Sequence, residues 1–205
     1  MSGESVLELS DLSFDELNIN ENLLRGIYGY GFEKPSIIQN KAIPVLVSGK
    51  DLIAQAQSGT GKTGAFSIGC LCNIDVKLKQ TQAIVLSPTR ELAEQTFNVM
   101  KELATYTDIS FCRVVGGTRV SECIDDLRKD PHVIVGTPGR IIDMLQKQHI
   151  YTDKLKMVVI DEADEMLSQG FQEMIYTIFT GIPKETQVAL FSATFPEELL
   201  EITDK

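Results

Sequence analysis

The stretch Ala56-Gln57-Ser58-Gly59-Thr60-Gly61-Lys62-Thr63 lies between a strand-like apolar run and a helix-like run. It fits the phosphate-binding loop pattern, with alanine in place of the usual first glycine. The glycines at 59 and 61 allow backbone N–H groups to turn toward an anion. Lys62 is placed to reach the β- and γ-phosphates of a nucleotide, and the Thr63 hydroxyl to ligate Mg²⁺. A glycine-rich turn without a ligand is the alternative, and the strand-then-helix placement disfavours it.

Outward from this loop, short apolar runs rich in β-branched residues alternate with longer helix-like stretches. The predicted strands are Leu52–Ala56, Ala83–Leu86, Phe111–Val115, His132–Val135, Met157–Ile160 and Val188–Phe191. The predicted helices include Arg90–Tyr106, Val120–Lys129, Gly139–Gln148 and Gly170–Gly181. Strands that are apolar on both faces and alternate with helices indicate a parallel sheet covered on two sides. We therefore expect an open α/β sandwich with functional residues at the carboxyl ends of its strands.

Two more helices are predicted ahead of the loop. Asn20 can cap a short helix over Glu21–Tyr28, and Ser36 can cap another that Pro44 interrupts and Gly49 ends. The segment before them is acidic, since the first 24 residues contain no lysine or arginine. We expect an acidic, flexible leader over residues 1–12 and one domain over residues 13–205.

The composition limits the possible functions. The chain has 205 residues and a formal net charge of −10, and 43% of its residues are hydrophobic, which fits a folded globule. Its longest apolar stretch without charge, Thr63–Ile74, has 12 residues, well below the roughly 20 that span a bilayer. We therefore expect no membrane partner and a cytoplasmic or nuclear address. The acidic balance disfavours binding of nucleic acid by bulk charge, and the cysteines fit reduced core thiols.

A second motif, Met157-Val158-Val159-Ile160-Asp161-Glu162, is an apolar strand that ends in two carboxylates. Such a pair is costly at the end of a buried strand unless a cation offsets its charge. Asp161 is placed to hold Mg²⁺, and Glu162 to orient or deprotonate an attacking water. Many strands end in Asp-Glu before a helix, so the pattern is weak alone. Together with the phosphate loop it indicates an NTPase.

Further motifs surround these two in the order of a known family. They are Gly31–Gln39 with Phe14 upstream, Pro88–Ala93, Gly116-Gly117, Thr137–Arg140, Asp161-Glu162-Ala163-Asp164 and Ser192-Ala193-Thr194. With them the chain resembles the DEAD-box ATP-dependent RNA helicases over about residues 14–196. The resemblance implies their amino-terminal RecA-like domain, a P-loop NTPase α/β fold with an open, mostly parallel sheet and helices on both faces.

The resemblance also implies ATP and Mg as cofactors and assigns residues to them. Gln39 would hydrogen-bond the adenine edge, because an amide supplies both a donor and an acceptor. Without the family frame, Gln39 is an ordinary solvated helix residue. The implied cofactor-binding residues are Phe14, Phe32, Lys34, Gln39, Gln57, Ser58, Gly59, Thr60, Gly61, Lys62 and Thr63. The implied catalytic residues are Lys62, Asp161 and Glu162, and the implied metal ligands are Thr63 and Asp161.

Other motifs are implied to hold the sugar-phosphate backbone of RNA without reading its sequence. The residues concerned are Pro88, Thr89, Arg90, Gly116, Gly117, Thr137, Gly139 and Arg140. They stand where strands give way to loops or helices, and such points offer free N–H groups to phosphate oxygens. Outside the family these are helix caps and first-turn arginines. Asp164, Ser192 and Thr194 are implied to couple ATP state to RNA, through hydroxyl bonds to Asp164; a strand-to-helix cap is the alternative.

Within the family, Leu23–Tyr28, Tyr30–Pro35 and Ile53–Thr63 are similar to the translation initiation factor 4A subfamily. Its exon-junction sister, which acts in splicing, is nearly as similar. The chain departs from the usual pattern at Ile38, Ser87 and Phe195. The resemblance implies RNA, a translation-initiation scaffold and the cap-binding complex as partners. It also implies a cytoplasmic address, or a nuclear one for the splicing paralogue.

Family helicases have two RecA-like domains, and the second supplies arginine fingers worth about 10³–10⁵ in rate in comparable NTPases. No arginine-rich motif follows Thr194 here, so we expect the second domain to be absent. Alone, the chain should then bind adenine nucleotide weakly and hydrolyse it hardly at all. Two other interpretations stay open. One is a phosphate-loop NTPase acting on protein or DNA, and the other is a nucleotide-binding interaction module without catalysis.

Overall fold

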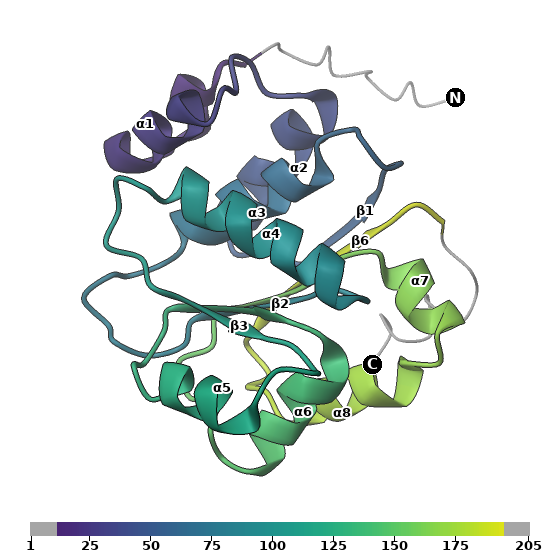
Figure 1. Cartoon of the computed structure of the whole chain (residues 1–205). Coiled ribbons are helices and arrows are strands. Elements are labelled where there is room, and N and C mark those ends of the chain that lie inside the picture. Colours follow the sequence, from purple (N-terminus) through teal and green to yellow (C-terminus); the bar gives the residue numbers. More distant parts are fainter. Residues whose placement is uncertain (1–11, 195–205) are drawn as a thin grey trace.

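A computed structural model describes residues 12–194 and shows a six-stranded sheet in the order β1-β6-β5-β2-β4-β3 (Figure 1). All neighbouring strands run parallel. The strands are β1 Leu52–Gln55, β2 Ala83–Leu86, β3 Phe111–Val114, β4 Val133–Gly136, β5 Met157–Ile160 and β6 Gln187–Ser192. The predicted open α/β fold is therefore confirmed, and each predicted strand is present within a residue or two of its expected bounds.

Helices cover both faces of the sheet (Figure 1). One face carries the 3-10 helix η1 Phe14–Leu17 and the helices α1 Glu21–Gly29, α2 Ile37–Val47, α3 Lys62–Cys72 and α4 Arg90–Leu103. The other carries α5 Val120–Leu127, α6 Pro138–Gln146, α7 Ala163–Ser168 and α8 Gln172–Thr180. Alternate strand residues enter two separate cores, with Val85 and Val159 in the first, and Ile84 and Val158 in the second. This is why the strands are apolar on both faces.

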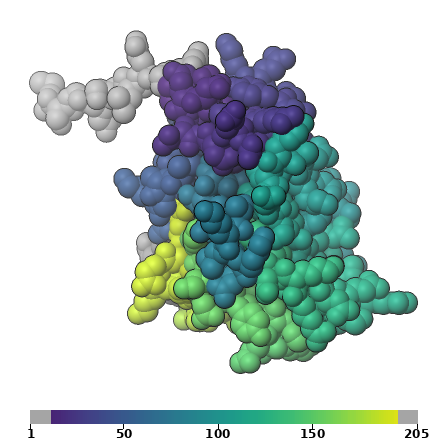
Figure 2. Space-filling model, turned by 90° about the vertical axis from the view of Figure 1, so that its left-hand side faces the viewer, coloured from purple at the N-terminus to yellow at the C-terminus, as the bar shows by residue number. Residues whose placement is uncertain are grey.

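The amino-terminal elements form a cap over one end of the molecule, drawn in purple in Figure 2. Phe14, Leu23 and Ile27 are fully buried in the first core. Gly26 allows close approach to α4, because a Cβ there would collide with the backbone carbonyl of Leu103. The predicted leader over residues 1–12 lies outside the described residues, apart from Leu12, which packs against the first core.

Two details of the helix prediction were wrong. Pro44 does not interrupt its helix, since α2 runs unbroken from Ile37 to Val47. Proline removes only one N–H donor, and the buried side chains of Ile43 and Leu46 anchor this helix on both sides of it. The helix expected over Gly170–Gly181 begins only at Gln172, because Gly170 has a left-handed φ of 77° that ends α7.

Within residues 12–194, none of the helices is long and apolar enough to cross a membrane.

Candidate nucleotide and nucleic-acid site

Apart from Gly31–Gln39 and Phe14, which precede β1, every motif predicted from the sequence follows a strand, so the parallel sheet brings these motifs to one edge, formed by the carboxyl ends of its strands. The strand order divides them into two groups. The ends of β1, β6 and β5 carry the phosphate loop, Ser192–Thr194 and Asp161–Asp164, and we call this group the phosphate-loop half. The ends of β2, β4 and β3 carry Pro88–Arg90, Thr137–Arg140 and Gly116-Gly117, and we call this group the arginine half.

The phosphate loop has the conformation that its glycines permit. Gly59 and Gly61 have φ of 81° and 96°, and the Thr60 hydroxyl donates to the carbonyl of Gln57 at 2.7 Å. Gly61 caps α3 without contributing a side-chain hydrogen bond, so the N–H groups of the first turn remain available to an anion. A Cβ at Gly61 would lie 2.7 Å from the Ser36 hydroxyl and 2.9 Å from the Gln39 amide nitrogen. Glycine is thus required there for conformation and for space.

Lys62 is held beside the acidic pair. Its ammonium lies 3.0 Å from a carboxylate oxygen of Glu162, with the two side chains 5% and 19% exposed. Glu162 itself has left-handed backbone angles, φ 50° and ψ 54°, which a non-glycine residue adopts only at some cost. Glu162 precedes α7, and its side chain reaches Lys62 at the end of the phosphate loop. In this structure Glu162 is thus the ion-pair partner of Lys62.

Asp161 is nearly as buried, at 5% exposed, and its Oδ1 accepts the N–H of Glu162 at 3.0 Å. Burial, and next the charge of Glu162, raise the pKa of Asp161 to about 7. A divalent cation would offset both causes. Carboxylate and hydroxyl oxygens such as those of Asp161 and Thr63 are the ligands that Mg²⁺ prefers. The donor set at this point therefore fits the expected metal.

Gln39 is not the solvated helix residue of the alternative interpretation, since it is 3% exposed. Its side-chain oxygen accepts the N–H of Ser36 at 2.9 Å in a capping box, and its nitrogen donates to the carbonyl of Gly61 at 3.2 Å. Gln39 therefore ties the start of α2 to the phosphate loop. Each of these two atoms keeps one further hydrogen-bonding position, a lone pair on the oxygen and an N–H on the nitrogen.

The aromatic residues near Gln39 are arranged in layers. The Phe32 ring lies against Gly64 of α3, and a Cβ on that glycine would come within 3.0 Å of it. Phe14 stacks on Phe32 with ring centroids 6.2 Å apart and is itself fully buried. The structure thus places Phe14 as support beneath Phe32, and it leaves Lys34 exposed at the surface.

Asp164 joins β5 to β6. Its carboxylate Oδ2 accepts both the hydroxyl of Thr194, at 2.8 Å, and its backbone N–H, at 3.0 Å. Burial alone would raise the pKa of Asp164, but hydrogen bonds to Thr194 and Ser192 outweigh it and lower that pKa. The Ser192 hydroxyl accepts the N–H of Asp164 at 3.1 Å and donates to the carbonyl of Thr194 at 2.7 Å. The Thr194 hydroxyl thus donates directly to the carboxylate, whereas the Ser192 hydroxyl links the backbones of Asp164 and Thr194.

The arginine half is open to solvent. A hollow of about 510 Å³ lies over it, and seven of the eight predicted RNA residues line this hollow. The exposed Arg90 guanidinium packs so closely on Gly117 that a Cβ there would collide with it. Arg140, in the first turn of α6, donates to the carbonyl of Thr118, which follows Gly117 in the same loop, at 3.2 Å. Both arginines are thus fixed against the glycine loop that follows β3.

Four residues that line this hollow were not among the predicted RNA residues: Pro138, which lies within the predicted motif Thr137–Arg140, and Asp143, Phe171 and Met174. Asp143 could have been found, because it stands three residues after Arg140 on one helix face. Phe171 and Met174 come from the start of α8, and only the packing of α8 beside α6 brings them here. No signal in the sequence links them to the arginines.

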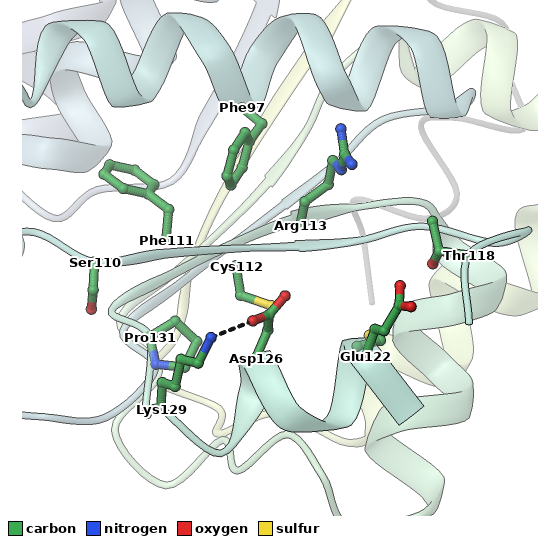
Figure 3. A pocket seen from close by; sticks show the side chains of 11 residues that line it. Phe97, Ser110, Phe111, Cys112, Arg113, Thr118, Glu122, Asp126, Lys129 and Pro131 are labelled. Atoms are coloured by element: carbon green, nitrogen blue, oxygen red, sulfur yellow. Dashed lines mark hydrogen bonds and ion pairs between the residues drawn. The ribbon is translucent and has the colours of Figure 1, made fainter. Parts of the chain in front are cut away.

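A second hollow of about 390 Å³ lies along the edge strand β3, between α4 and α5 (Figure 3). Phe97 and Phe111 approach it from one side of the strand, and Cys112 and Asp126 from the other. Asp126 pairs there with Lys129 at 2.6 Å. The residues that line it include none of those predicted for the site, although Thr118, which accepts a hydrogen bond from Arg140, borders it.

The sequence profile of the family described as DEAD/DEAH box helicase matches residues 36–202. Among curated proteins, "ATP-dependent RNA helicase eIF4A" of Pyricularia oryzae is 53% identical over 193 residues, which is 94% of this chain and 49% of that protein. The protein of the same name from Saccharomyces cerevisiae is 54% identical over 94% of this chain and 48% of its own length. The chain therefore spans about half the length of the curated relatives it matches.

Solved structures give the same assignment. A DEAD box protein from the hyperthermophile Methanococcus jannaschii superposes with a TM-score of 0.91 at 36% identity, over 94% of this chain and 53% of that one. Dbp5 of S. cerevisiae, in a structure bound to RNA and ADP BeF3, superposes with a TM-score of 0.83 at 39% identity, over 94% of this chain and 49% of that one. The fold is the RecA-like domain that the resemblance implied, and the chain belongs to the DEAD/DEAH box helicase family.

Proposed function

We propose that this chain binds Mg·ATP in the phosphate-loop half and the backbone of single-stranded RNA in the arginine half. The observation that carries the proposal is the meeting of Lys62, Asp161 and Glu162 beside the first turn of α3. A lysine, two carboxylates and free helix N–H groups are the parts that phosphoryl transfer requires. The names of the eIF4A relatives, each an "ATP-dependent RNA helicase", support ATP as the nucleotide.

The residues have separate roles in hydrolysis. Lys62 exchanges Glu162 for the β- and γ-phosphates, which frees the Glu162 carboxylate to orient an attacking water and accept its proton. Thr63 and Asp161 would hold Mg²⁺, which supplies charge neutralisation on the phosphates when it is bound. The Gln39 amide reads the adenine edge and, through its bond to Gly61, reports base binding to the loop.

RNA binding rests on the geometry of the arginine half. Arg90 and Arg140 present guanidinium groups that pair well with phosphate oxygens, and α4 and α6 begin at this surface with free N–H groups. Such contacts hold the backbone and ignore the bases. The acidic net charge of −10 is compatible with this, because a few fixed arginines and amides do the binding.

Asp164 and Thr194 connect the two functions. Their bonds tie the helix that follows the acidic pair to the end of β6, so a change at the nucleotide alters a hydrogen-bonded unit shared by both strands. We assign these residues, with Ser192, to the coupling of ATP state to RNA binding.

In the complete protein, we propose a second RecA-like domain of the same chain that closes on this edge and supplies arginine fingers. The resulting activity would be ATP-dependent RNA unwinding in translation initiation, in the cytoplasm, with a scaffold and the cap-binding complex as partners. The eIF4A relatives favour this assignment over the exon-junction paralogue.

Binding by the 205-residue chain tests the proposal first. A fluorescent ADP should bind in the presence of Mg²⁺ and be displaced by ATP but not by GTP, and a labelled single-stranded RNA should bind independently of its sequence. Joined to the second domain, the protein should hydrolyse ATP when RNA is added and not when DNA is added. Equal stimulation by DNA would support the rival NTPase, and binding without any hydrolysis would support the interaction module.

A further inference from the structure

Ser87 follows β2 directly, and its side chain is fully buried. Its hydroxyl oxygen has no hydrogen-bond partner among the described residues. A buried polar group without a partner destabilises the fold, so such groups are rare and are commonly tied to function. The function proposed so far makes no use of this hydroxyl.

The sheet places Ser87 beside Asp161. β2 and β5 are paired neighbours, with Leu86 opposite Ile160. The N–H of Asp161 donates to the carbonyl of Leu86 at 3.0 Å, which carries the same ladder one step further. Ser87 therefore stands opposite Asp161 on adjacent strands, which lie about 4.8 Å apart in a sheet.

The two side chains also share a face of the sheet. Val85 and Val159, two residues earlier on the same strands, both point into the first core, under α3 and α4. Side chains alternate along a strand, so Ser87 and Asp161 point to that same face. This same face is covered by α3, whose first turn contains Thr63.

Asp161 has room for another donor. Within residues 12–194 the one hydrogen bond that its carboxylate accepts comes from the N–H of Glu162, at 3.0 Å to Oδ1. A carboxylate can accept about four. A side chain that is 5% exposed cannot fill the remaining places from bulk water, so it depends on a cation and on buried donors.

We propose that Ser87 is a positioning residue for Asp161. In the nucleotide-bound state its hydroxyl donates to the Asp161 carboxylate and fixes the orientation in which that carboxylate holds Mg²⁺. Groups that orient a metal ligand in this way commonly affect metal affinity by about 10–100-fold. The inference rests on the proposed function, because it takes the metal site of that function as given.

The test is a titration of the ADP complex of the 205-residue chain with Mn²⁺, followed by electron paramagnetic resonance. Ser87→Ala should weaken Mn²⁺ binding about tenfold, since one hydrogen bond to the ligand is lost, and should leave the affinity for metal-free ADP unchanged. The ligand-free variant should unfold at the same temperature as the parent or higher, because it loses a hydroxyl that has no partner there.

Ser67→Ala is the matched control. Ser67 lies on α3, is also fully buried, and its hydroxyl is likewise without a partner in the described structure. This variant should leave Mn²⁺ affinity unchanged, whereas Asp161→Asn should abolish Mn²⁺ binding. If Ser87→Ala does not fold, Ser87→Cys keeps a donor at this position, though a weaker one on a larger atom, and should lose part of the affinity.

Three results would overturn the inference. They are unchanged Mn²⁺ affinity in Ser87→Ala, an equal loss in Ser67→Ala, and a lower unfolding temperature of ligand-free Ser87→Ala with normal Mn²⁺ binding. The last would indicate a structural role only. If the parent chain with ADP binds no Mn²⁺, the proposed metal site itself fails, and the inference falls with it.

Discussion

The two halves both lie at the carboxyl ends of parallel strands, but they differ in how deeply their residues are buried. In the phosphate-loop half, Lys62 and Asp161 are buried, and Lys62 forms an ion pair with Glu162. Gln39 of α2 is buried beside them and donates a hydrogen bond to the carbonyl of Gly61 in the loop. In the arginine half, Arg90 and Gly117 are exposed and a hollow of about 510 Å³ opens to solvent. Electrostatic stabilisation of a reacting phosphate gains from exclusion of water, whereas a long sugar-phosphate chain needs an open track. In the proposed function, burial therefore separates phosphoryl transfer from binding of the RNA backbone.

The halves meet at the centre of the sheet, where β5 borders β2. Asp161 and Ser87 stand opposite each other at that border, and the arginine-bearing stretch Thr89–Arg90 follows Ser87 within three residues. Adjacent strand ends therefore connect the two halves directly, in addition to the bond between Asp164 and Thr194, and both connections are routes for the proposed coupling.

The largest expected effect comes from Glu162→Gln. Loss of the carboxylate removes the base but keeps the shape, so RNA-stimulated ATP hydrolysis of the complete protein should fall about 10²–10⁴-fold. Binding of Mg·ADP by this chain should persist, because Lys62 loses its ion-pair partner and remains free for the phosphates. Steady-state ATPase assays measure the rate of hydrolysis, and nucleotide titrations measure the binding of Mg·ADP. Hydrolysis at the parent rate would remove Glu162 from its assigned role.

Gly61→Ala tests the structure of the phosphate-loop half. The variant must adopt a φ of 96° and its Cβ would press on Ser36 and Gln39, so we expect a loss of about 2–4 kcal/mol in unfolding free energy and loss of nucleotide binding.

Gly59→Ala is its matched control. Gly59 has a φ of 81°, but a Cβ there meets no atom within 4 Å, so this change should cost only about 1 kcal/mol. Urea unfolding compares the two variants. Equal losses would show that the contact with Gln39 contributes nothing beyond backbone strain.

The arginine half should respond more weakly to single substitutions. Arg140→Ala should reduce RNA affinity about fivefold and lower the slope of log affinity against log salt by about 1, while leaving ADP binding unchanged. Arg128→Ala removes an equally long side chain from the far end of α5, where it pairs with Asp125, and should alter neither. Fluorescence anisotropy at several salt concentrations separates these outcomes. A loss confined to certain RNA sequences would contradict a backbone contact.

The smallest effect concerns His132, a buried titratable residue at the amino end of β4, outside both halves. His132 is fully buried before β4 and its Nδ1 accepts the N–H of Ser110 at 3.0 Å. Burial, and next the charge of Lys79, lower the pKa of His132 below its usual 6.5. The unfolded chain then binds the proton more readily than the native one, so stability is full above pH 6.5 and falls as the pH drops below it.

Urea unfolding at pH 7.5 and pH 5.5 measures this dependence. In His132→Gln the part of the pH slope that His132 supplies should disappear, and His149→Gln, at a partly exposed position, serves as the matched control. An identical pH slope in parent and His132→Gln would show that the buried imidazole does not supply it.

Much of the fold could be predicted because its signals are local. β-branched runs that are apolar on both faces indicate strands of a covered parallel sheet, and the glycines of the phosphate loop fix where α3 begins. The passage of α2 through Pro44 could not be predicted in this way, since buried contacts of Ile43 and Leu46 outweigh a single lost donor. The break at Gly170 was missed because a glycine can either begin or end a helix.

The sequence by itself determined the family, the strand ends on which the chemistry lies and the kind of groups placed there, because spacing along the chain carries those facts. Only the tertiary structure decided which groups meet. The order β1-β6-β5-β2-β4-β3 separates the two halves, pairs Lys62 with Glu162, buries Gln39 on the loop and brings Phe171 and Met174 beside the arginines. Strand order and helix packing are settled by burial of non-local surface, which no single stretch of sequence displays.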